Sequence, residues 1–316
     1  MEDIFKYCTK DQMNDFLLSL HLLPKEKNAL KILYTLSNHT ERHYRECKIP
    51  KRTNGFRTLH IPDPLLKSVQ NNLLHQVLEQ IPISIYAKAY HKGADLVSNA
   101  EPHIRKKIIL KLDIEDFYDT IDYIMVYNTV FKKEIFPKPL RTLLTHLCLY
   151  NEMLPQGSPT SPAISNIVMK PFDDYIGTFC EKKNISYTRY ADDLIFSGNF
   201  NIKELLHKVS AYLKKMGFTL NPKKTKVLKR NNKQFITGII VNEKLQVDKK
   251  YRQRIRQELY YIQKFGLYSH MNRRHIENKD KYLKNLLGKI QFVLHVCPEN
   301  IEFQKYRSYL LKQRKK

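Results

Sequence analysis

Apolar residues recur every three or four positions in several long segments of the chain, which is the period of one helix face. Residues 10–38 show this spacing first, mainly with leucines. The same pattern predicts helices over residues 64–80, about 163–180 and 205–218. Beyond Asp248, a suitable N-cap, the pattern is helical and very basic to the end of the chain.

Other segments are rich in β-branched and aromatic residues, as strands are. IILKLDI at 108–114 and FITGIIV at 235–241 are predicted strands, and ISYTRYADDLIFSG predicts two strand arms joined at Ala191-Asp192. Residues 47–62 predict a hairpin, because Asn54-Gly55 is a strong turn signal between extended arms.

The order of these elements suits an α+β fold in which helices cover one face of a sheet layer. A loop with three prolines, PQGSPTSP at 155–162, precedes the helix near 163–180. The basic C-terminal third is predicted to form a separate helical unit, and its boundary lies near 235–248.

Lys and Arg outnumber Asp and Glu so strongly that the formal net charge is +24. Such an excess indicates an anionic partner, either nucleic acid or an anionic membrane surface. No apolar run approaches the roughly 18 residues of a membrane span, and the first residues do not resemble a signal peptide. The five cysteines are scattered and form no C-x-x-C pair, which predicts free thiols and no zinc site. We therefore expect a cytoplasmic protein with a nucleic-acid partner and no membrane partner.

Two of the predicted strands lead to carboxylates. Asp113 directly follows an apolar run, and Asp192 and Asp193 fall at the tip of a predicted hairpin. An Asp-Asp pair seen alone is usually a solvated turn. If both strands lie side by side in one sheet, three carboxylates meet at one edge, where hard cations would make their repulsion tolerable. We therefore predict a site for two Mg²⁺ ions, which can support an in-line phosphoryl displacement.

KLDIEDFY, LPQGSPTSP and RYADD occur in this order, and together they resemble three ordered motifs of reverse transcriptases. The resemblance implies a right-hand polymerase with fingers, a palm whose antiparallel sheet is covered by helices, and a short helical thumb. It implies that Asp113 and Asp192 bind both catalytic metal ions and that Asp193 assists. The carbonyl group of Ile114 would complete the shell of one ion.

The resemblance extends to a nucleotide site. Tyr118 matches the aromatic sugar gate of the family, whose ring favours dNTPs by clashing with a ribose 2′-OH. NGFRTLHIP resembles the fingers hairpin and places Arg57 over the incoming triphosphate, where a guanidinium fits phosphate. The remaining matches are Gln156 and Gly157 as nucleotide and template contacts, and Lys224 or its neighbour Lys223 near the triphosphate. Without the motifs, each residue has a structural alternative. Tyr118 could be a core aromatic, Gln156 and Gly157 part of a proline-rich loop, and the cations ordinary surface residues.

SNAEPHIRK at 98–106 contains Asn99-Ala100-x-x-His103, which is similar to the N-A-x-x-H motif of retron reverse transcriptases. FITGIIV resembles their V-T-G motif, with Ile236 in place of Val. Asn99 and His103 are assigned to RNA binding on this resemblance, and a turn with an exposed imidazole is the alternative.

The retron type implies an RNA-directed DNA polymerase that copies part of a structured noncoding RNA into single-stranded DNA, called msDNA. It implies that synthesis is primed from a 2′-OH of that RNA. A role in anti-phage defence and a toxin or effector protein as a further partner are implied in the same way.

The basic C-terminal segment agrees with an RNA partner. Residues 251–262 carry an apolar stripe at helical spacing, while Arg252, Arg254 and Arg256 occupy other faces. We predict that these arginines bind RNA phosphates with a strong dependence on salt, and a solvated charged helix is the alternative. Core packing and stacking on unpaired bases both remain open for Tyr260, Tyr261 and Tyr268.

We expect N-terminal helices and fingers over 1–107, a palm with the carboxylates over 108–240 and a basic RNA-binding thumb over 241–316. Part of 128–170 would be shared between fingers and palm. Two rival interpretations remain open. One is another small bacterial reverse transcriptase, of the diversity-generating or abortive-infection type, and the other is a non-catalytic RNA-binding scaffold.

Overall fold

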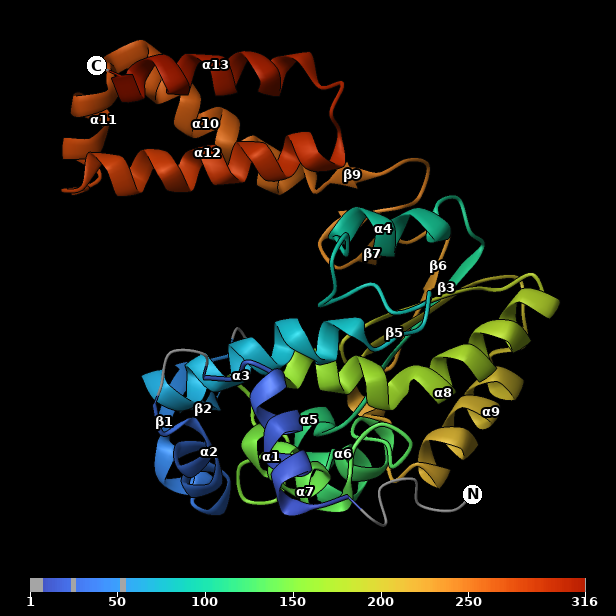
Figure 1. Cartoon of the computed structure of the whole chain (residues 1–316). Helices are drawn as coiled ribbons and strands as arrows, with labels where there is room; N and C mark the ends of the chain where they lie inside the picture. The colour runs from blue at the N-terminus through green and yellow to red at the C-terminus, as the bar shows by residue number, and fades with distance from the viewer. Residues whose placement is uncertain (1–7, 24–26, 52–54, 316) are drawn as a thin grey trace. The chain divides into compact units, whose positions relative to one another are not determined.

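The computed structural model describes residues 8–23, 27–51 and 55–315 (Figure 1). The chain divides into two compact units, and we refer to them as the first and second unit. The first unit comprises Met1–Ala94, Lys111–Ile195 and Phe200–Lys226. The second unit comprises Asp95–Leu110, Phe196–Asn199 and Val227–Lys316. Residues 95–107, which we expected with the N-terminal segment, therefore group with the basic C-terminal helices.

The N-terminal segment contains two helices, where the spacing predicted helix throughout 10–38. Helix α1 (Lys10–Ser19) begins at a capping box in which the side chains of Thr9 and Gln12 each bond the other's backbone N–H. Helix α2 (Ala29–Asn38) begins nine residues after Leu20, the C-cap of α1. Leucines recur at helical spacing across 10–38, but the spacing of apolar residues does not by itself show where one helix ends and the next begins.

A short 3₁₀ turn, η1 (Thr40–His43), leads into the predicted hairpin of β1 (Tyr44–Pro50) and β2 (Phe56–Pro62). The strands pair antiparallel from Tyr44 opposite Pro62 to Pro50 opposite Phe56. Asn54, the first residue of the expected turn, lies outside the described residues. Gly55, at the other side of the turn, has a φ of +104°.

Helices make up most of the rest of the first unit. The predicted helix at 64–80 is divided into α3, capped by Asp63, and a 3₁₀ turn, η2. The long helix α8 carries an internal proline and lies beside α9, as Figure 1 shows. These elements are α3 (Pro64–Gln76), η2 (Leu78–Gln80), α5 (Phe117–Thr120), α6 (Tyr123–Thr129), α7 (Lys138–Cys148), α8 (Ser161–Lys182) and α9 (Ile202–Lys215).

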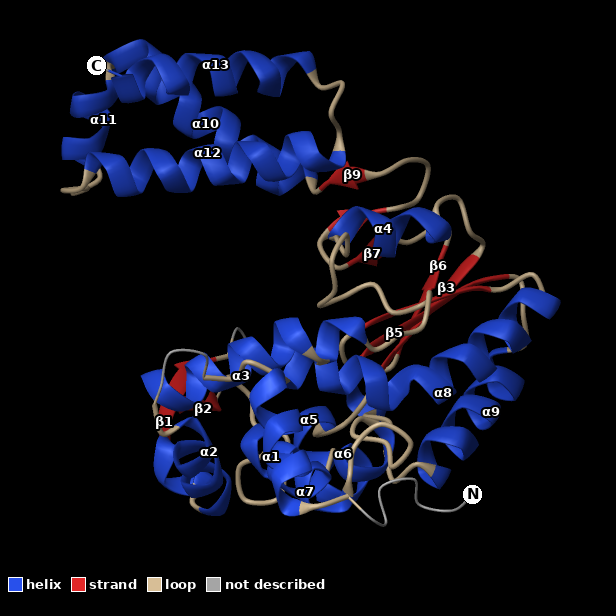
Figure 2. Ribbon diagram, viewed as in Figure 1, coloured by secondary structure: helices blue, strands red, loops and turns tan. Residues whose placement is uncertain are grey.

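Four strands form a sheet in the order β4-β5-β3-β6 (Figure 2). Its strands are β3 (Ile108–Asp113), β4 (Ser186–Tyr190), β5 (Asp193–Gly198) and β6 (Lys226–Lys229). Most residues of the inner strands β3 and β5 are buried. This mixture of a sheet layer and helices confirms the predicted α+β class.

The part of the second unit that precedes the C-terminal helices is built from short elements. They are α4 (Leu96–Ala100), η3 (Glu101–His103), β7 (Phe235–Ile236), β8 (Ile239–Ile240) and β9 (Gln246–Val247). The single strand predicted for FITGIIV is wrong, because the chain turns at Thr237 and Gly238 and pairs β7 with β8 antiparallel. Both turn residues have a positive φ, +42° and +98°, which continuous strand does not allow.

The C-terminal segment is helical, as predicted. Asp248 caps α10 by accepting a hydrogen bond from the Lys250 backbone N–H at 3.1 Å. Ile255, Leu259 and Ile262 form the buried stripe of α10. The helices are α10 (Lys249–Phe265), α11 (Leu267–Arg273), α12 (Lys279–Val296) and α13 (Ile301–Lys315), and α12 and α13 run side by side in Figure 1. No helix of the described residues is both long enough and apolar enough to cross a lipid bilayer.

Candidate active site

The three carboxylates singled out from the sequence meet at one end of the central sheet. Asp113 is the last residue of β3, and Asp193 is the first residue of β5, the neighbouring strand. The backbone N–H of Ile114 donates to the carbonyl oxygen of Asp192 at 3.0 Å, which joins the end of β3 to the turn before β5. This turn is tight, and Ala191 within it has a left-handed φ of +57°.

The carboxylates repel one another. Burial raises the pKa of Asp192 to about 6, and the negative charges of Asp193 and Asp113 add to this effect. Burial also raises the pKa of Asp193, although Lys111 opposes the shift. A raised carboxyl pKa means that the negative charge is poorly compensated by the surrounding protein.

Lys224 is a cation in direct contact with this cluster. It ends a short 3₁₀ turn, η4 (Pro222–Lys224), which Asn221 caps. Its Nζ donates to both carboxylate oxygens of Asp113, at 2.7 and 3.0 Å. The hydrogen bond to Asp113 raises the pKa of Lys224, so this lysine stays protonated. Of the two lysines considered from the sequence, Lys224 is therefore the one that contacts the carboxylates.

The donors at this site fit a hard divalent cation. Carboxylate oxygens are the ligands that Mg²⁺ prefers, and the raised pKa of Asp192 shows negative charge that a cation would compensate. Among the described residues, no group of three or more His, Cys, Asp or Glu side chains is already arranged as a metal cage. Lys224 uses one lone pair on each oxygen of Asp113, so a bound cation and this lysine would share the carboxylate.

A buried ion pair fixes the turn that carries Asp192. Arg189 on β4 and Asp173 on α8 are both fully buried, with 2.7 Å between Nη2 and Oδ2. Arg189 also donates through Nη1 to the carbonyl oxygen of Ala191 at 3.1 Å. This ion pair was not predicted from the sequence. The sequence shows an Arg inside a predicted strand and an Asp inside a predicted helix, but neither residue indicates which residue it pairs with.

Tyr118 lies close to the carboxylates. It belongs to the short helix α5, which follows Asp116, a residue in the left-handed conformation at φ +42°. Burial raises the pKa of the Tyr118 hydroxyl, and interactions with Tyr90 and with the charge of Asp192 raise it further. The position expected for a sugar gate is thus within electrostatic range of Asp192.

The loop that contains Gln156 and Gly157 is bound to the fingers-like hairpin. The backbone N–H of His60 on β2 donates to the carbonyl oxygen of Gln156 at 2.7 Å. Gly157 has a φ of +124°, and a Cβ there would lie 2.8 Å from the carbonyl oxygen of His60. The close backbone approach expected at Gly157 therefore exists, and its partner in this structure is strand β2. Arg57 lies exposed on β2 opposite Ile49, and within the described ranges it forms no ion pair with the carboxylates.

Comparison with known proteins identifies the family. A family model described as reverse transcriptase (RNA-dependent DNA polymerase) matches residues 49–252. The chain belongs to the reverse transcriptase family. The catalytic chemistry of this family is RNA-directed DNA polymerisation, which generally uses divalent metal ions.

Several relatives are retron reverse transcriptases. The retron Ec83 enzyme of Escherichia coli is 31% identical over 299 residues, which cover 89% of this chain and 92% of the relative. The retron Mx65 enzyme of Myxococcus xanthus is 30% identical over 280 residues, and these are 83% of this chain but 63% of that protein, so the chain spans less than two thirds of its length. The predicted retron type of this reverse transcriptase is therefore confirmed.

A solved structure supports the expected fold. Telomerase from Candida albicans, in complex with a fragment of telomeric RNA, aligns with a TM-score of 0.50 and 13% sequence identity. The alignment covers 84% of this chain and 59% of that chain. This likeness concerns the fold alone, and it agrees with the right-hand architecture predicted for the reverse transcriptase.

Asn99 and His103 do not lie at the surface of the reverse transcriptase. Both side chains are fully buried within the second unit. His103 Nδ1 lies 2.6 Å from the Ser197 hydroxyl at the end of β5, and Asn99 donates to the Thr237 hydroxyl at 3.3 Å. Burial lowers the pKa of His103 to about 3, so its imidazole is neutral. The alternative of an exposed imidazole is therefore wrong, because these side chains tie α4 and η3 to the turn after β7 and to β5. RNA binding by Asn99 and His103 stays a prediction.

The three arginines of α10 have different environments. Arg254 is exposed, whereas Arg252 donates to the Val247 carbonyl oxygen at 3.1 Å. Arg256 forms two hydrogen bonds to Glu302 on α13, at 2.7 and 2.6 Å. In this structure the Arg256 guanidinium therefore joins two helices, and its binding to RNA stays a prediction.

The tyrosines of the same region are exposed and accompanied by cations. Tyr260 is 54% exposed and Tyr268 is 64% exposed, so core packing does not describe either side chain. Lys264 lies over the Tyr260 ring and Lys279 over the Tyr268 ring, at 5.5 and 5.3 Å from the ring centroids. Aromatic rings beside cations are suited to unpaired bases and phosphates.

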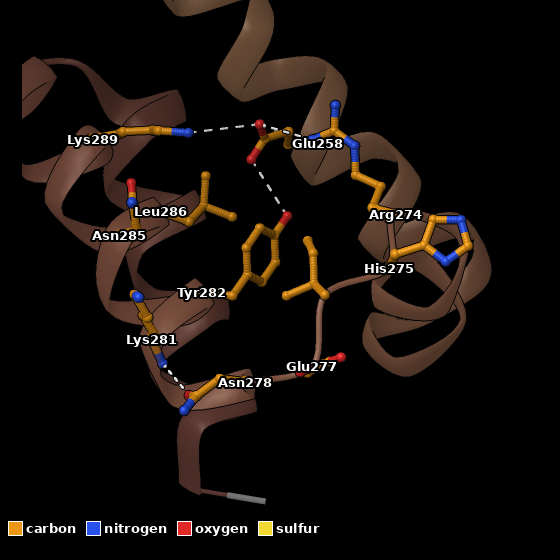
Figure 3. A pocket seen from close by; sticks show the side chains of 11 residues that line it. Glu258, Arg274, His275, Glu277, Asn278, Lys281, Tyr282, Asn285, Leu286 and Lys289 are labelled. Atoms are coloured by element: carbon orange, nitrogen blue, oxygen red, sulfur yellow. Dashed lines mark hydrogen bonds and ion pairs between the residues drawn. The ribbon is translucent and has the colours of Figure 1, made fainter. Parts of the chain in front are cut away.

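A cavity of about 420 Å³ lies among α10, the end of α11 and α12 (Figure 3). Glu258 points into it and interacts with Arg274 at 3.2 Å, with Lys289 at 3.7 Å and with the Tyr282 hydroxyl at 3.4 Å. Since two cations and a phenol surround one carboxylate, this cluster holds the three helices together in the structure.

Proposed function

We propose that this retron reverse transcriptase copies part of a structured noncoding RNA into single-stranded msDNA, starting from a 2′-OH of that RNA. The proposal that the protein catalyses polymerisation rests on one observation. Asp113 and Asp192 lie together at one end of the sheet, where the pKa of Asp192 is raised to about 6. The names of the relatives support the retron product.

The proposed cofactor is a pair of Mg²⁺ ions. Asp113 and Asp192 would hold both ions, Asp193 would assist and the carbonyl of Ile114 would add a ligand. The bound ions would activate the attacking hydroxyl and stabilise the leaving oxygen. Lys224 would exchange its contact with Asp113 for the triphosphate, where an ammonium group can donate a proton to the departing pyrophosphate.

The remaining nucleotide contacts are proposed from the positions of the residues in the structure. Tyr118, beside Asp192, would exclude a ribose 2′-OH by its ring. Gln156 and Gly157 would line the nucleotide and template path next to β2, and Arg57 on the exposed hairpin would bind the triphosphate. The noncoding RNA and its DNA product would bind the basic surface that includes Arg254. A role in anti-phage defence with a toxin or effector partner is part of the same proposal, supported by the retron type alone.

The deciding experiment is to sequence the nucleic acid that copurifies with the protein. A short DNA joined to RNA through a 2′,5′ branch is expected, since the primer is proposed to be an internal 2′-OH. Linear DNA with ordinary 3′-OH priming would support another type of small bacterial reverse transcriptase instead. Asp192→Asn is expected to abolish dNTP incorporation and to leave RNA binding intact, so polymerisation by this variant would refute the metal assignment.

A further inference from the structure

A second cavity of the second unit has walls that are mainly aromatic and cationic. Its volume is about 390 Å³, within the range of about 300–1,000 Å³ that small-ligand sites occupy. Among the described residues that line it, none is acidic. They come from α10, from α11 and from the C-cap of α11: Tyr261, Phe265, Ser269, His270, Arg273 and Arg274. A cavity with this lining suits a ligand that is both aromatic and anionic.

Three rings of this cavity have nearly the same orientation. The Tyr261 ring is inclined by 22° to that of Phe265 and by 16° to that of His270, with 6.2 Å between the centroids in each pair. Tyr261 is 36% exposed and Phe265 is 51% exposed, so part of each ring is open to solvent. A flat heteroaromatic group can therefore stack on these rings in the orientation that they already have.

Hydrogen bonds hold the α11 side of this aromatic wall in place. His270 is buried, and its Nε2 atom lies 3.1 Å from the Tyr282 hydroxyl on α12. The same hydroxyl donates at 3.4 Å to Glu258, the carboxylate of the neighbouring cavity in Figure 3. Because Tyr261 stacks on His270, this network orients the wall before a ligand binds, which lowers the entropic cost of binding.

The cations around the cavity differ in their availability. Arg274 is bound to Glu258 at 3.2 Å, as Figure 3 shows. Lys264 lies over the Phe265 ring, 5.4 Å from its centroid. Arg273 is exposed, and it forms no ion pair with any residue that the structure describes. Arg273 is therefore the guanidinium that can bind a phosphate next to the stacked rings.

We propose that this cavity binds an unpaired nucleotide of the noncoding RNA, with its base stacked on Tyr261 and Phe265 and a phosphate on Arg273. The inference rests on the proposed RNA partner of this reverse transcriptase. The bases of a duplex cover each other's faces, so an unpaired base is needed to present a free face to the rings. Aromatic stacking combined with a phosphate contact is a general way of holding single strands. The cavity therefore favours a loop or a single-stranded end of the RNA over its helical stems.

The test compares two RNA probes that carry the same number of phosphates, a fluorescein-labelled oligoadenylate and a blunt RNA duplex. Fluorescence anisotropy gives the affinity of the full-length protein for each probe. Tyr261→Ala is expected to weaken oligoadenylate binding about tenfold, within the range for loss of one stacked base, and duplex binding by less than about twofold. Tyr34, on α2 of the first unit, is also 36% exposed, so Tyr34→Ala is the matched control and should change neither affinity.

The salt dependence separates the stacking contact from the phosphate contact. Arg273→Ala is expected to lower the slope of log K against log salt by about 0.7, the value for one phosphate of a single strand. Tyr261→Ala should lower the affinity and leave this slope unchanged, because stacking releases no counterion. Phe265→Ala is the second stacking variant, and it should reproduce the effect of Tyr261→Ala if the latter fails to fold.

Two outcomes would overturn the proposal. One is oligoadenylate binding that stays at the wild-type level in both stacking variants, including the case in which the cavity binds an acidic peptide instead. The other is an equal loss for the single strand and the duplex. DNA synthesis by the wild-type protein on a primed RNA template is measured separately. Failure of that synthesis with stacking intact refutes the proposed polymerase function and leaves the nucleotide site standing, so the two failures are distinguishable.

Discussion

Asp173→Asn is expected to destabilise the protein far more than the same change one residue later. Asp173 is fully buried and accepts hydrogen bonds from Arg189 Nε, Arg189 Nη2 and the Tyr187 hydroxyl, at 2.7 to 3.0 Å. The amide has a similar shape but no charge, so the substitution leaves the buried guanidinium of Arg189 without its counter-ion.

The magnitude follows from this burial. Removing one partner of a buried ion pair costs about 3–5 kcal/mol, because the remaining charge stays out of water. Single domains have a total stability of about 5–15 kcal/mol, so this loss is a large fraction of it. Asp174 pairs with Lys170 at 2.6 Å, but its side chain is 45% exposed. Loss of a solvent-screened pair of this kind costs about 0–1 kcal/mol, which makes Asp174→Asn the matched control.

Urea unfolding followed by circular dichroism measures the difference between the two variants. A clear drop in the midpoint is expected for Asp173→Asn and almost none for Asp174→Asn. Replacing both Asp173 and Arg189 by Leu should cost less than Asp173→Asn, because no buried charge is left unpaired. Equal midpoints for the two Asn variants would refute the argument from burial.

Three further predictions concern the active site and the RNA surface. Gly157→Ala is expected to lower the free energy of unfolding in urea by roughly 1–3 kcal/mol and to reduce polymerisation, because its φ is +124° and the new Cβ would clash with strand β2. Gly288→Ala should have neither effect, since its Cβ would meet nothing within 4 Å. Protons compete with the cation below the Asp192 pKa of about 6, so half-maximal polymerisation should need more Mg²⁺ as the pH falls from about 7.5 to about 5.5. Arg254→Ala should lower the salt dependence of RNA binding in filter assays, whereas Arg256→Ala should mainly lower stability.

The sequence was sufficient to predict that the three carboxylates come together, because each lies at the end of a strand that can be recognised locally. Asp113, Asp192 and Asp193 each interrupt an apolar run, and adjacency of the two strands brings them together. Lys224 could be assigned to within one residue, since the motif places it after α9 but does not fix the direction of each side chain. The 3₁₀ turn at 222–224 determines which lysine faces Asp113.

The missed features depend on tertiary pairing. Arg189 and Asp173 are 16 residues apart and meet because β4 packs on α8, which no local pattern encodes. Asn99 and His103 matched a motif, but a motif identifies residues without stating whether their side chains are exposed. Because both residues are polar, they were expected at the surface. Their hydrogen-bond partners Thr237 and Ser197 allow them to be buried.

The constraints around the carboxylates have a common physical basis. Ala191, Asp116 and Tyr90 all have a positive φ, and such conformations cost about 1–3 kcal/mol each in a residue with a side chain. Three neighbouring carboxylates add repulsion to this strain. The buried Arg189 pair and the main-chain bonds to β4 offset these costs without removing the excess negative charge. A divalent cation would relieve that repulsion and would bind the folded state alone, so metal binding should stabilise the protein by an amount that rises with the logarithm of the free metal concentration.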